Sequence, residues 1–181
     1  MRVLGYSGMH RSMQVKQRQF PSLDSRIHRF SQGYDSAAAL LVDGIVVAAA
    51  AEERFTGDKT TGAFPVNAIR YCLQQGDLKI DEIDKLAHGF AYAPGSLHEK
   101  DEYSRMRYRT IYSVDAQIGW AEEFFPGPEW SERFEPVPHH LAHAASSFFP
   151  SGFSDALVVV SDGMGESDSL RGLCETQFEE V

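Results

Sequence analysis

The strongest constraint on the fold lies between Asp35 and Ala51, where two apolar runs flank the dipeptide Asp43-Gly44. Asp-Gly is favoured in type I′ turns because both central residues of that turn need a positive φ. The pattern therefore predicts an antiparallel β-hairpin. Neither run alternates polar with apolar residues, so we expect both strands to lie inside a sheet, covered on both faces.

The remaining predicted elements alternate between strands and helices. Strands are expected at 3–6, 85–90 and 156–161, and helices at 64–73, at one or two places within 94–135, and at 139–149. Pro65 and Gly76 mark the start and the end of the first helix. Residues 9–32 have no helical or strand period and are expected to form a long loop, either a solvated excursion or a basic lid over an anionic ligand. Together these elements predict an α/β protein.

Charge and cysteine usage restrict the class of protein. The chain has 181 residues and a formal charge of −9, from 17 Lys and Arg against 26 Asp and Glu. This balance argues against a surface for nucleic acid or anionic membranes. Two cysteines are too few for a disulfide framework, and no run approaches the ~18 apolar residues of a membrane span. We therefore expect a soluble, cytoplasmic protein.

Three histidines, His139, His140 and His143, fall within five residues of the predicted helix 139–149. Residues i and i+4 share a helix face, so His139 and His143 are expected to point the same way. Each imidazole offers one neutral nitrogen to a metal at ~2.0–2.2 Å, and the pair predicts half of a divalent-metal site. The alternative is that these histidines lie on the solvent-exposed face of an Ala-rich helix and bind no metal. His140 lies about 100° further round and is expected to support a ligand or to contact a substrate.

The predicted strand 156–161 runs directly into Asp162-Gly163-Met164-Gly165. A strand that stops at Asp and glycines is where α/β proteins place backbone amides against a phosphate. Asp162 can therefore ligate a metal, orient a phosphate or only cap a turn. The charged segment Glu52–Lys59 ends the predicted hairpin, either at a ligand-binding sheet edge or as a solvated loop with an internal Glu–Arg pair.

Asp35-Ser36, before the hairpin, forms a second acidic turn with a small residue. In the actin-like ATPase (ribonuclease H-like) architecture, each of two lobes contributes one such turn to a nucleotide between them. We therefore predict an actin-like lobe with a mixed sheet, a β-hairpin near its start and flanking helices. The predicted boundaries are 1–153 for this first lobe and 154–181 for the first strand and phosphate turn of a second lobe.

Three segments resemble, in order and spacing, the antibiotic- and nodulation-type O-carbamoyltransferases. They are GYDSAAALLVDGIVVAAAAEERFT at 33–56, FPVNAIRYCLQQGDLKIDEID at 64–84 and HHLAHAASSFFPSGFSDALVVVSDGMGE at 139–166. The resemblance implies an actin-like domain, similar to tRNA threonylcarbamoyl transferases, followed by a YrdC-like domain. In that family the YrdC-like domain makes carbamoyl-adenylate from carbamoyl phosphate and ATP. The actin-like domain then transfers the carbamoyl group to a hydroxyl of a small molecule beside a divalent metal, typically iron.

The resemblance also assigns roles to residues. It implies that His139, His143 and Asp162 hold the metal and that Asp162, Gly163 and Gly165 bind the cofactor. Lys59 matches a basic position that faces the carbamoyl-adenylate, with Arg54 near it, and these cations would neutralise the phosphate as it leaves. Asp35 belongs to the first acidic turn of the site. The family usually has His, a candidate catalytic base, before that Asp, whereas this chain has Tyr34. Either His28 or His10 substitutes for that base, or the step is impaired.

Most of the second lobe and the whole YrdC-like domain have no counterpart in these residues. The expected partners are therefore those parts, in the same chain or in trans, with carbamoyl phosphate or carbamoyl-adenylate and a hydroxylated acceptor. The chain is thus expected to be a fragment, a truncated product or one subunit of a split enzyme. A non-catalytic metal- or nucleotide-binding remnant and a small metal-dependent hydrolase that uses the two histidines and Asp162 are the competing interpretations.

Overall fold

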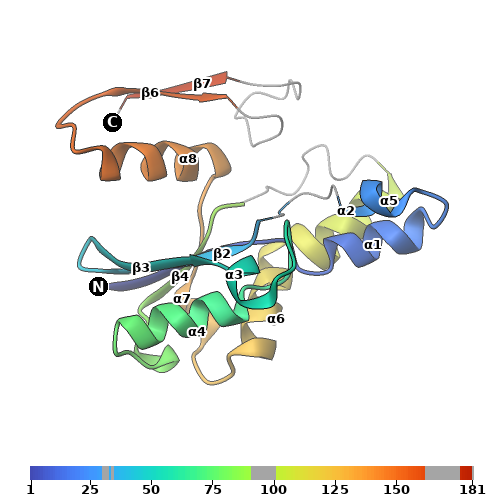
Figure 1. The fold of residues 1–181 in the computed structure, drawn as a ribbon, viewed down its shortest axis with the longest axis horizontal. Coiled ribbons are helices and arrows are strands. Elements are labelled where there is room, and N and C mark those ends of the chain that lie inside the picture. Colours follow the sequence, from blue (N-terminus) through green and yellow to red (C-terminus); the bar gives the residue numbers. More distant parts are fainter. Residues whose placement is uncertain (30–32, 34, 91–100, 162–175, 181) are drawn as a thin grey trace.

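The computed structural model describes residues 1–29, 33, 35–90, 101–161 and 176–180 (Figure 1). Its centre is a five-stranded mixed sheet in the order β3-β2-β1-β4-β5. The strands are β1 (Arg2–Ser7), β2 (Ala37–Val42), β3 (Ile45–Ala51), β4 (Lys85–His88) and β5 (Phe134–Pro136). β2 pairs antiparallel with β1 and β3, whereas β4 pairs parallel with β1 and β5. The fold class is therefore α/β with a mixed sheet, as predicted.

The hairpin is confirmed in its position and in its turn. Asp43 has φ 51° and Gly44 φ 82°, which are the two positive values that the Asp-Gly sequence predicts. The prediction that both strands are covered is wrong for β3, which is the edge strand: Ile45 is 70% exposed and Val46 57% exposed. A lack of polar alternation does not distinguish an interior strand from an edge strand with apolar side chains.

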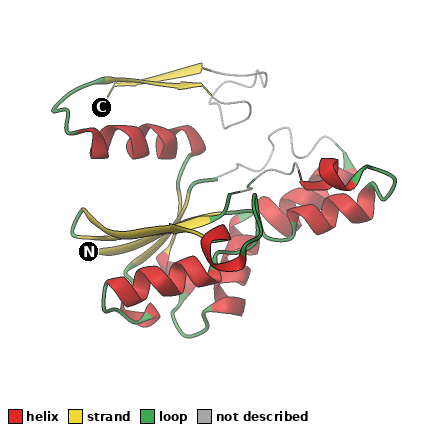
Figure 2. Cartoon of the chain, in the orientation of Figure 1, coloured by secondary structure: helices red, strands yellow, loops and turns green. Residues whose placement is uncertain are grey.

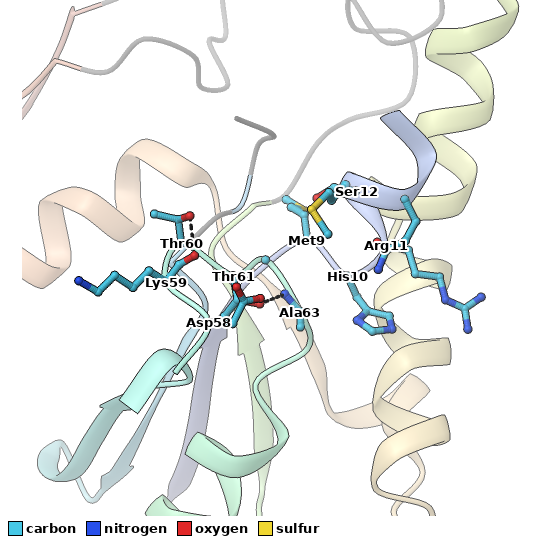
Figure 3. Close-up of a pocket in the computed structure, with 12 residues that line it drawn as sticks. Met9, His10, Arg11, Ser12, Asp58, Lys59, Thr60, Thr61 and Ala63 are labelled. Carbon is cyan, nitrogen blue, oxygen red and sulfur yellow. Dashed lines mark hydrogen bonds between the residues drawn. The ribbon is translucent and has the colours of Figure 1, made fainter. Parts of the chain in front are cut away.

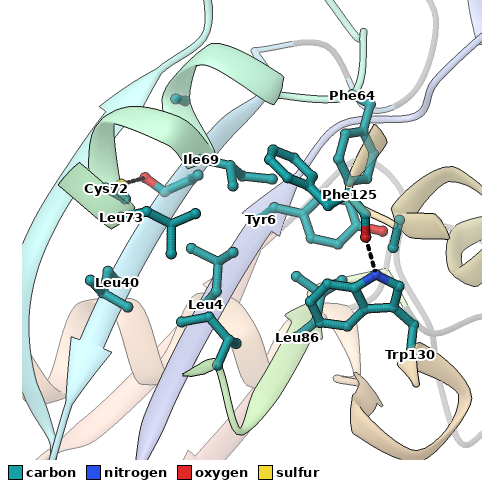
Figure 4. Close-up of a cluster of buried hydrophobic side chains, with 14 of the residues drawn as sticks. Leu4, Tyr6, Leu40, Phe64, Ile69, Cys72, Leu73, Leu86, Phe125 and Trp130 are labelled. Atoms are coloured by element: carbon teal, nitrogen blue, oxygen red, sulfur yellow. Dashed lines mark hydrogen bonds between the residues drawn. The ribbon is translucent and has the colours of Figure 1, made fainter. Parts of the chain in front are cut away.

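Helices cover one face of the sheet and enclose the main core (Figure 2). They are α4 (Val66–Gln75), α6 (Val114–Phe124) and α7 (Trp130–Arg133), with α3 (Glu53–Thr56) at the end of β3 and the 3-10 turn η1 (Ile80–Glu82) before β4. Leu4, Leu40 and Leu86 stand opposite one another across three strands, so they point to the same face. In Figure 4 they meet Ile69 and Leu73 from α4. The helix predicted at 64–73 is confirmed, with Gly76 at its C-cap.

The segment predicted as a loop, 9–32, contains two helices, α1 (Ser12–Gln19) and α2 (Ser25–Arg29). α1 carries few apolar residues, which is why the sequence shows no helical period. The helix is stabilised by tertiary packing, because Val15 packs against Met9, Ile111 and Tyr112. Residues 101–125 form α5 (Glu102–Arg107), the π-helical segment η3 (Tyr108–Tyr112) and α6.

A separate layer lies on the opposite face of the sheet from α4 and α6 (Figure 1). It consists of α8 (His139–Phe148), η4 (Phe149–Ser151) and the antiparallel pair β6 (Leu157–Ser161) and β7 (Thr176–Glu180). Both the helix predicted at 139–149 and the strand predicted at 156–161 are confirmed. Among the described residues, no helix is long and apolar enough to cross a membrane.

Candidate two-histidine metal centre

The two histidines of the HxxxH pattern lie at the start of α8 and point toward each other. His139 Nε2 and His143 Nε2 are 3.2 Å apart, and the ring centroids are 4.5 Å apart. His139 is 8% exposed, whereas His143 is exposed. The i,i+4 spacing has therefore placed two imidazole nitrogens at one point of the helix surface, as the sequence predicts.

The backbone of β4 fixes which nitrogen of His139 faces His143. The Nδ1 of His139 lies 3.0 Å from the carbonyl oxygen of Gly89, the first residue after β4. A carbonyl only accepts, so Nδ1 carries the proton and the lone pair is on Nε2. The ring of Phe90 stacks on the His139 ring, with 4.3 Å between centroids and 23° between planes. The tautomer and the plane of His139 are both set before any ligand binds.

The separation of the two Nε2 atoms suits a shared metal ion. Ligand nitrogens about 2.1 Å from one ion lie about 3.0 Å apart at a right angle and about 3.4 Å apart at the tetrahedral angle. The observed 3.2 Å falls between these values. A proton on His143 Nε2 can bridge the same gap. Two imidazoles suit iron, zinc, copper or nickel better than magnesium or calcium.

The third predicted ligand, Asp162, lies outside the described residues, as do Gly163, Gly165 and Tyr34. In the part of the chain that the structure describes, no cluster of three His, Cys, Asp or Glu side chains has metal-binding geometry. Ser161, the last residue of β6, lines a cavity of about 240 Å³ with His143, Ser147, Val159 and Val160. The end of β6 therefore lies near His143, and the assignment of Asp162 as a ligand stays a prediction.

A further histidine, His88, holds the end of β4 in place and was not singled out from the sequence. It is 2% exposed, and its Nε2 donates to the carbonyl of Gly8 at 3.1 Å. Burial lowers its pKa to about 4, so the ring is neutral at physiological pH. This contact joins the end of β4 to the end of β1. A His followed by Gly near the end of a predicted strand is the sequence signal that could have drawn attention to it.

The predicted nucleotide side of the site is more open. Lys59 is exposed and lines a second cavity of about 170 Å³ between the segments 9–14 and 58–63 (Figure 3). In that view its ammonium group points away from the neighbouring Thr61 and Met9. Arg54 pairs with Glu53 at 3.4 Å and is not among the residues around the cavity. Asp35 is exposed and has φ 62°.

Neither histidine proposed to replace the missing base is placed as a free base. His28 is buried and its Nε2 binds the carbonyl of Phe20 at 2.8 Å. His10 Nδ1 accepts from the backbone N–H of Phe64 at 3.1 Å, so its Nε2 carries the proton. Burial and the charge of Arg11 lower the pKa of His10, which keeps the ring neutral. His10 can donate a hydrogen bond through Nε2, but that nitrogen does not accept one.

His140 is 3% exposed, and its ring centroid is 6.0 Å from that of His139. It thus lies next to the pair without sharing its convergence point. Its predicted role, supporting a ligand or contacting a substrate, stays a prediction.

Known proteins resemble this chain over half to three-quarters of its length. It is 35% identical over 151 residues to the uncharacterized protein sll1178 of Synechocystis, and 32% identical over 143 residues to the nodulation protein NolNO of Sinorhizobium fredii. Each match covers 74% of this chain but only 24% and 20% of those proteins. An uncharacterized 19.2 kDa protein of Rhizobium etli is 33% identical over 88 residues, 49% of this chain and 47% of that protein. No family model matches the chain.

Proposed function

We propose that the chain is the N-terminal module of an O-carbamoyltransferase. It would transfer a carbamoyl group from carbamoyl-adenylate, made from carbamoyl phosphate and ATP, to a hydroxyl of a small molecule. The observation that carries the proposal is the 3.2 Å approach of His139 Nε2 to His143 Nε2, with the His139 tautomer fixed by Gly89. The relative named as a nodulation protein and the motifs of the three segments support it.

The metal is proposed to be bound by His139, His143 and Asp162. Two imidazoles and one carboxylate are the ligand set of many non-haem iron(II) sites, so iron is the first candidate. The ion would supply a Lewis acid that polarises the carbamoyl carbonyl. The cavity of about 240 Å³ beside His143 offers room for a small polar group next to that point.

The reaction follows from the proposed substrates. The acceptor oxygen forms a bond to the carbamoyl carbon, the bond from that carbon to the phosphate oxygen breaks, AMP leaves and the acceptor loses its proton. We propose that Lys59 and Arg54 stabilise the negative charge on the departing phosphate. Asp35, Tyr34 and the turn at 162–165 are proposed to complete the nucleotide side.

The strand order β3-β2-β1-β4-β5, with β2 alone antiparallel to the other strands, supports an actin-like, ribonuclease H-like first lobe. We propose that this lobe comprises residues 1–153 and that 154–181 begins the second lobe. The separate sheet of β6 and β7 supports this boundary. The proposed compartment is the cytoplasm.

The chain spans about a quarter or less of the first two relatives, so the proposed enzyme needs further parts. We propose that a second lobe and a YrdC-like domain act with it, in the same chain or in trans. The alternative is a metal- or nucleotide-binding module, or a subunit of a split enzyme, without transfer activity of its own.

The test combines metal analysis with an activity assay, using His143→Ala and the neighbouring Ser146→Ala as a matched control on the same helix. His143→Ala should lower metal affinity at least about 100-fold, because one imidazole and one carboxylate hold a first-row ion weakly. Carbamoyl transfer, assayed with ATP, carbamoyl phosphate, a hydroxylated acceptor and a separately supplied YrdC-like partner, should be lost with it. Ser146→Ala should change neither.

Undiminished metal in purified His143→Ala would refute the ligand assignment. Metal bound as expected, with no carbamoyl transfer under any combination of partners, would favour the metal-binding module over the enzyme.

A further inference from the structure

Three consecutive residues, His88 at the end of β4 and Gly89 and Phe90 just after it, hold the strand end and the ring of His139 in place. His88 donates a hydrogen bond to the carbonyl of Gly8 and so anchors the strand end. The carbonyl of Gly89 accepts a hydrogen bond from Nδ1 of His139. Phe90 stacks on the His139 ring at 4.3 Å. Nothing in the sequence motifs or in the names of the relatives assigns these three residues a role.

The hydrogen bond to Gly89 does not by itself orient the imidazole. A single N–H···O=C contact fixes the direction of Nδ1, but the ring can still tilt about that bond, because carbonyl acceptors tolerate a broad range of angles. A tilt moves Nε2, on the far side of the ring, away from His143. A flat ring stacked at 23° removes that freedom from one face. Phe90 therefore supplies the constraint that Gly89 lacks.

Phe90 is itself held by a part of the chain far away in sequence. It packs against the cluster of Met9, Ile111 and Tyr112. Its ring also lies 5.6 Å from that of His88. The position of the aromatic face thus depends on the segment before α1 and on η3.

We propose that Phe90 is a positioning residue of the two-histidine centre, whose ring sets the plane of His139 and thereby the metal affinity of the pair. This inference rests on the proposed metal site. Groups that orient a metal-binding histidine by a hydrogen bond typically change metal affinity about 10- to 100-fold when replaced, and Phe90 orients the same ring by stacking.

The test uses Co²⁺ as the probe, because its visible absorption reports both binding and coordination geometry. Phe90→Leu keeps an apolar side chain but removes the flat face, and should weaken Co²⁺ binding about 10-fold and alter the visible spectrum. Phe90→Tyr keeps the ring and should restore wild-type affinity and spectrum. Phe125→Leu is the matched control, since Phe125 is a buried ring in the main core beside Trp130 and Phe64. It should lower the melting temperature without changing Co²⁺ affinity.

The possible outcomes separate the two proposals. Wild-type affinity and spectrum in folded Phe90→Leu would overturn the positioning role and leave the metal site intact. Equal loss in Phe90→Leu and Phe125→Leu would also overturn it, since the effect would then be one of general stability. Wild-type protein that binds Co²⁺ no better than His143→Ala would overturn the metal site and the positioning role together. Should Phe90→Leu not fold, Phe90→Met is the second apolar replacement. Its Co²⁺ affinity and visible spectrum are then compared with those of the wild type in the same way.

Discussion

The two candidate regions of this protein are built in opposite ways. The histidine pair is set on a helix and fixed by backbone and ring contacts from the end of β4. The cavity near Lys59 is lined by two connecting segments, with Lys59 and Arg11 largely in solvent. In the first region His139 is buried and its contacts Gly89 and Phe90 are half-buried, whereas the second region consists mostly of exposed or half-buried groups.

This difference shows which parts of the proposed site are already formed by the described residues. Metal ligands need a fixed geometry, and here the geometry is present for two of them. A phosphate site needs several donors converging on one point, whereas here Lys59 lines the cavity and Arg54 pairs with Glu53 outside it. In the proposed metal site His139 is therefore held in place by Gly89 and Phe90, whereas the proposed nucleotide site needs further groups.

The largest change in the free energy of unfolding is expected from the protonation of His88. It tests whether water is excluded from the end of β4, as the burial of His88 indicates. The pKa of His88 is about 4 in the folded protein, against about 6.5 in the unfolded chain. Between these values the unfolded state binds more protons, so stability is complete above about pH 6.5 and falls as pH decreases toward 4. The full loss from this one group is about 3 kcal/mol.

Urea unfolding of the wild type and of His88→Gln, from about pH 7 to about pH 4, measures this loss. Gln keeps an N–H donor for the carbonyl of Gly8 but cannot be protonated, so its stability should fall about 3 kcal/mol less over that range. The carboxylates and the other histidines are the same in both proteins, so their contributions cancel in the difference. Parallel curves for the two proteins would mean that water reaches His88 and that the two regions are less different than described.

A smaller effect is expected from Gly89→Ala, which changes the fit between β4 and α8. A Cβ at Gly89 would lie 3.2 Å from the Cβ of Ala142, so α8 must move by a few tenths of an ångström. The carbonyl of Gly89 also accepts the hydrogen bond from His139 Nδ1. The movement of α8 should therefore weaken Co²⁺ binding several-fold to about 10-fold.

Gly119→Ala is the matched control for this substitution. Gly119 lies within α6, and nothing stands within 4 Å of the position its Cβ would take. Alanine there should stabilise the helix by up to about 1 kcal/mol and leave Co²⁺ affinity unchanged. Equal Co²⁺ affinities of wild type and Gly89→Ala would show that α8 can adjust without moving His139, and that this region is less rigid than its contacts suggest.

The sequence predicted the features that depend on local geometry. Asp43-Gly44 specifies its turn because of its backbone φ values, and His139 and His143 share a face because of helical periodicity. What it could not predict depends on partners distant in sequence. α1 has too few apolar residues to show a period and is supported by packing against Ile111 and Tyr112.

Glu52 is the clearest example of a role set by distant partners. Within a charged run it looks solvated, yet it is 3% exposed. Its carboxylate accepts from the backbone N–H of Asn67 at 3.2 Å and of Ala68 at 2.8 Å, at the start of α4. A carboxylate at a helix N-terminus satisfies amides that have no partner within the helix. Only its neighbour Glu53 makes the predicted pair with Arg54.

The smallest change in the free energy of unfolding is expected from Lys59→Ala, in the cavity between the segments 9–14 and 58–63. The side chain is exposed, so its removal should change the free energy of unfolding by no more than about 0.5 kcal/mol and leave Co²⁺ affinity unchanged. If Lys59 faces the adenylate phosphate, binding of AMP, the proposed leaving group, should still weaken a few-fold, as NMR titration can measure. Lys79→Ala removes the same charge at another exposed position and should leave AMP binding unaltered. A loss of more than about 1 kcal/mol in Lys59→Ala would show that the loop cavity is ordered as tightly as the histidine pair, because exposed side chains outside such packing rarely have that effect.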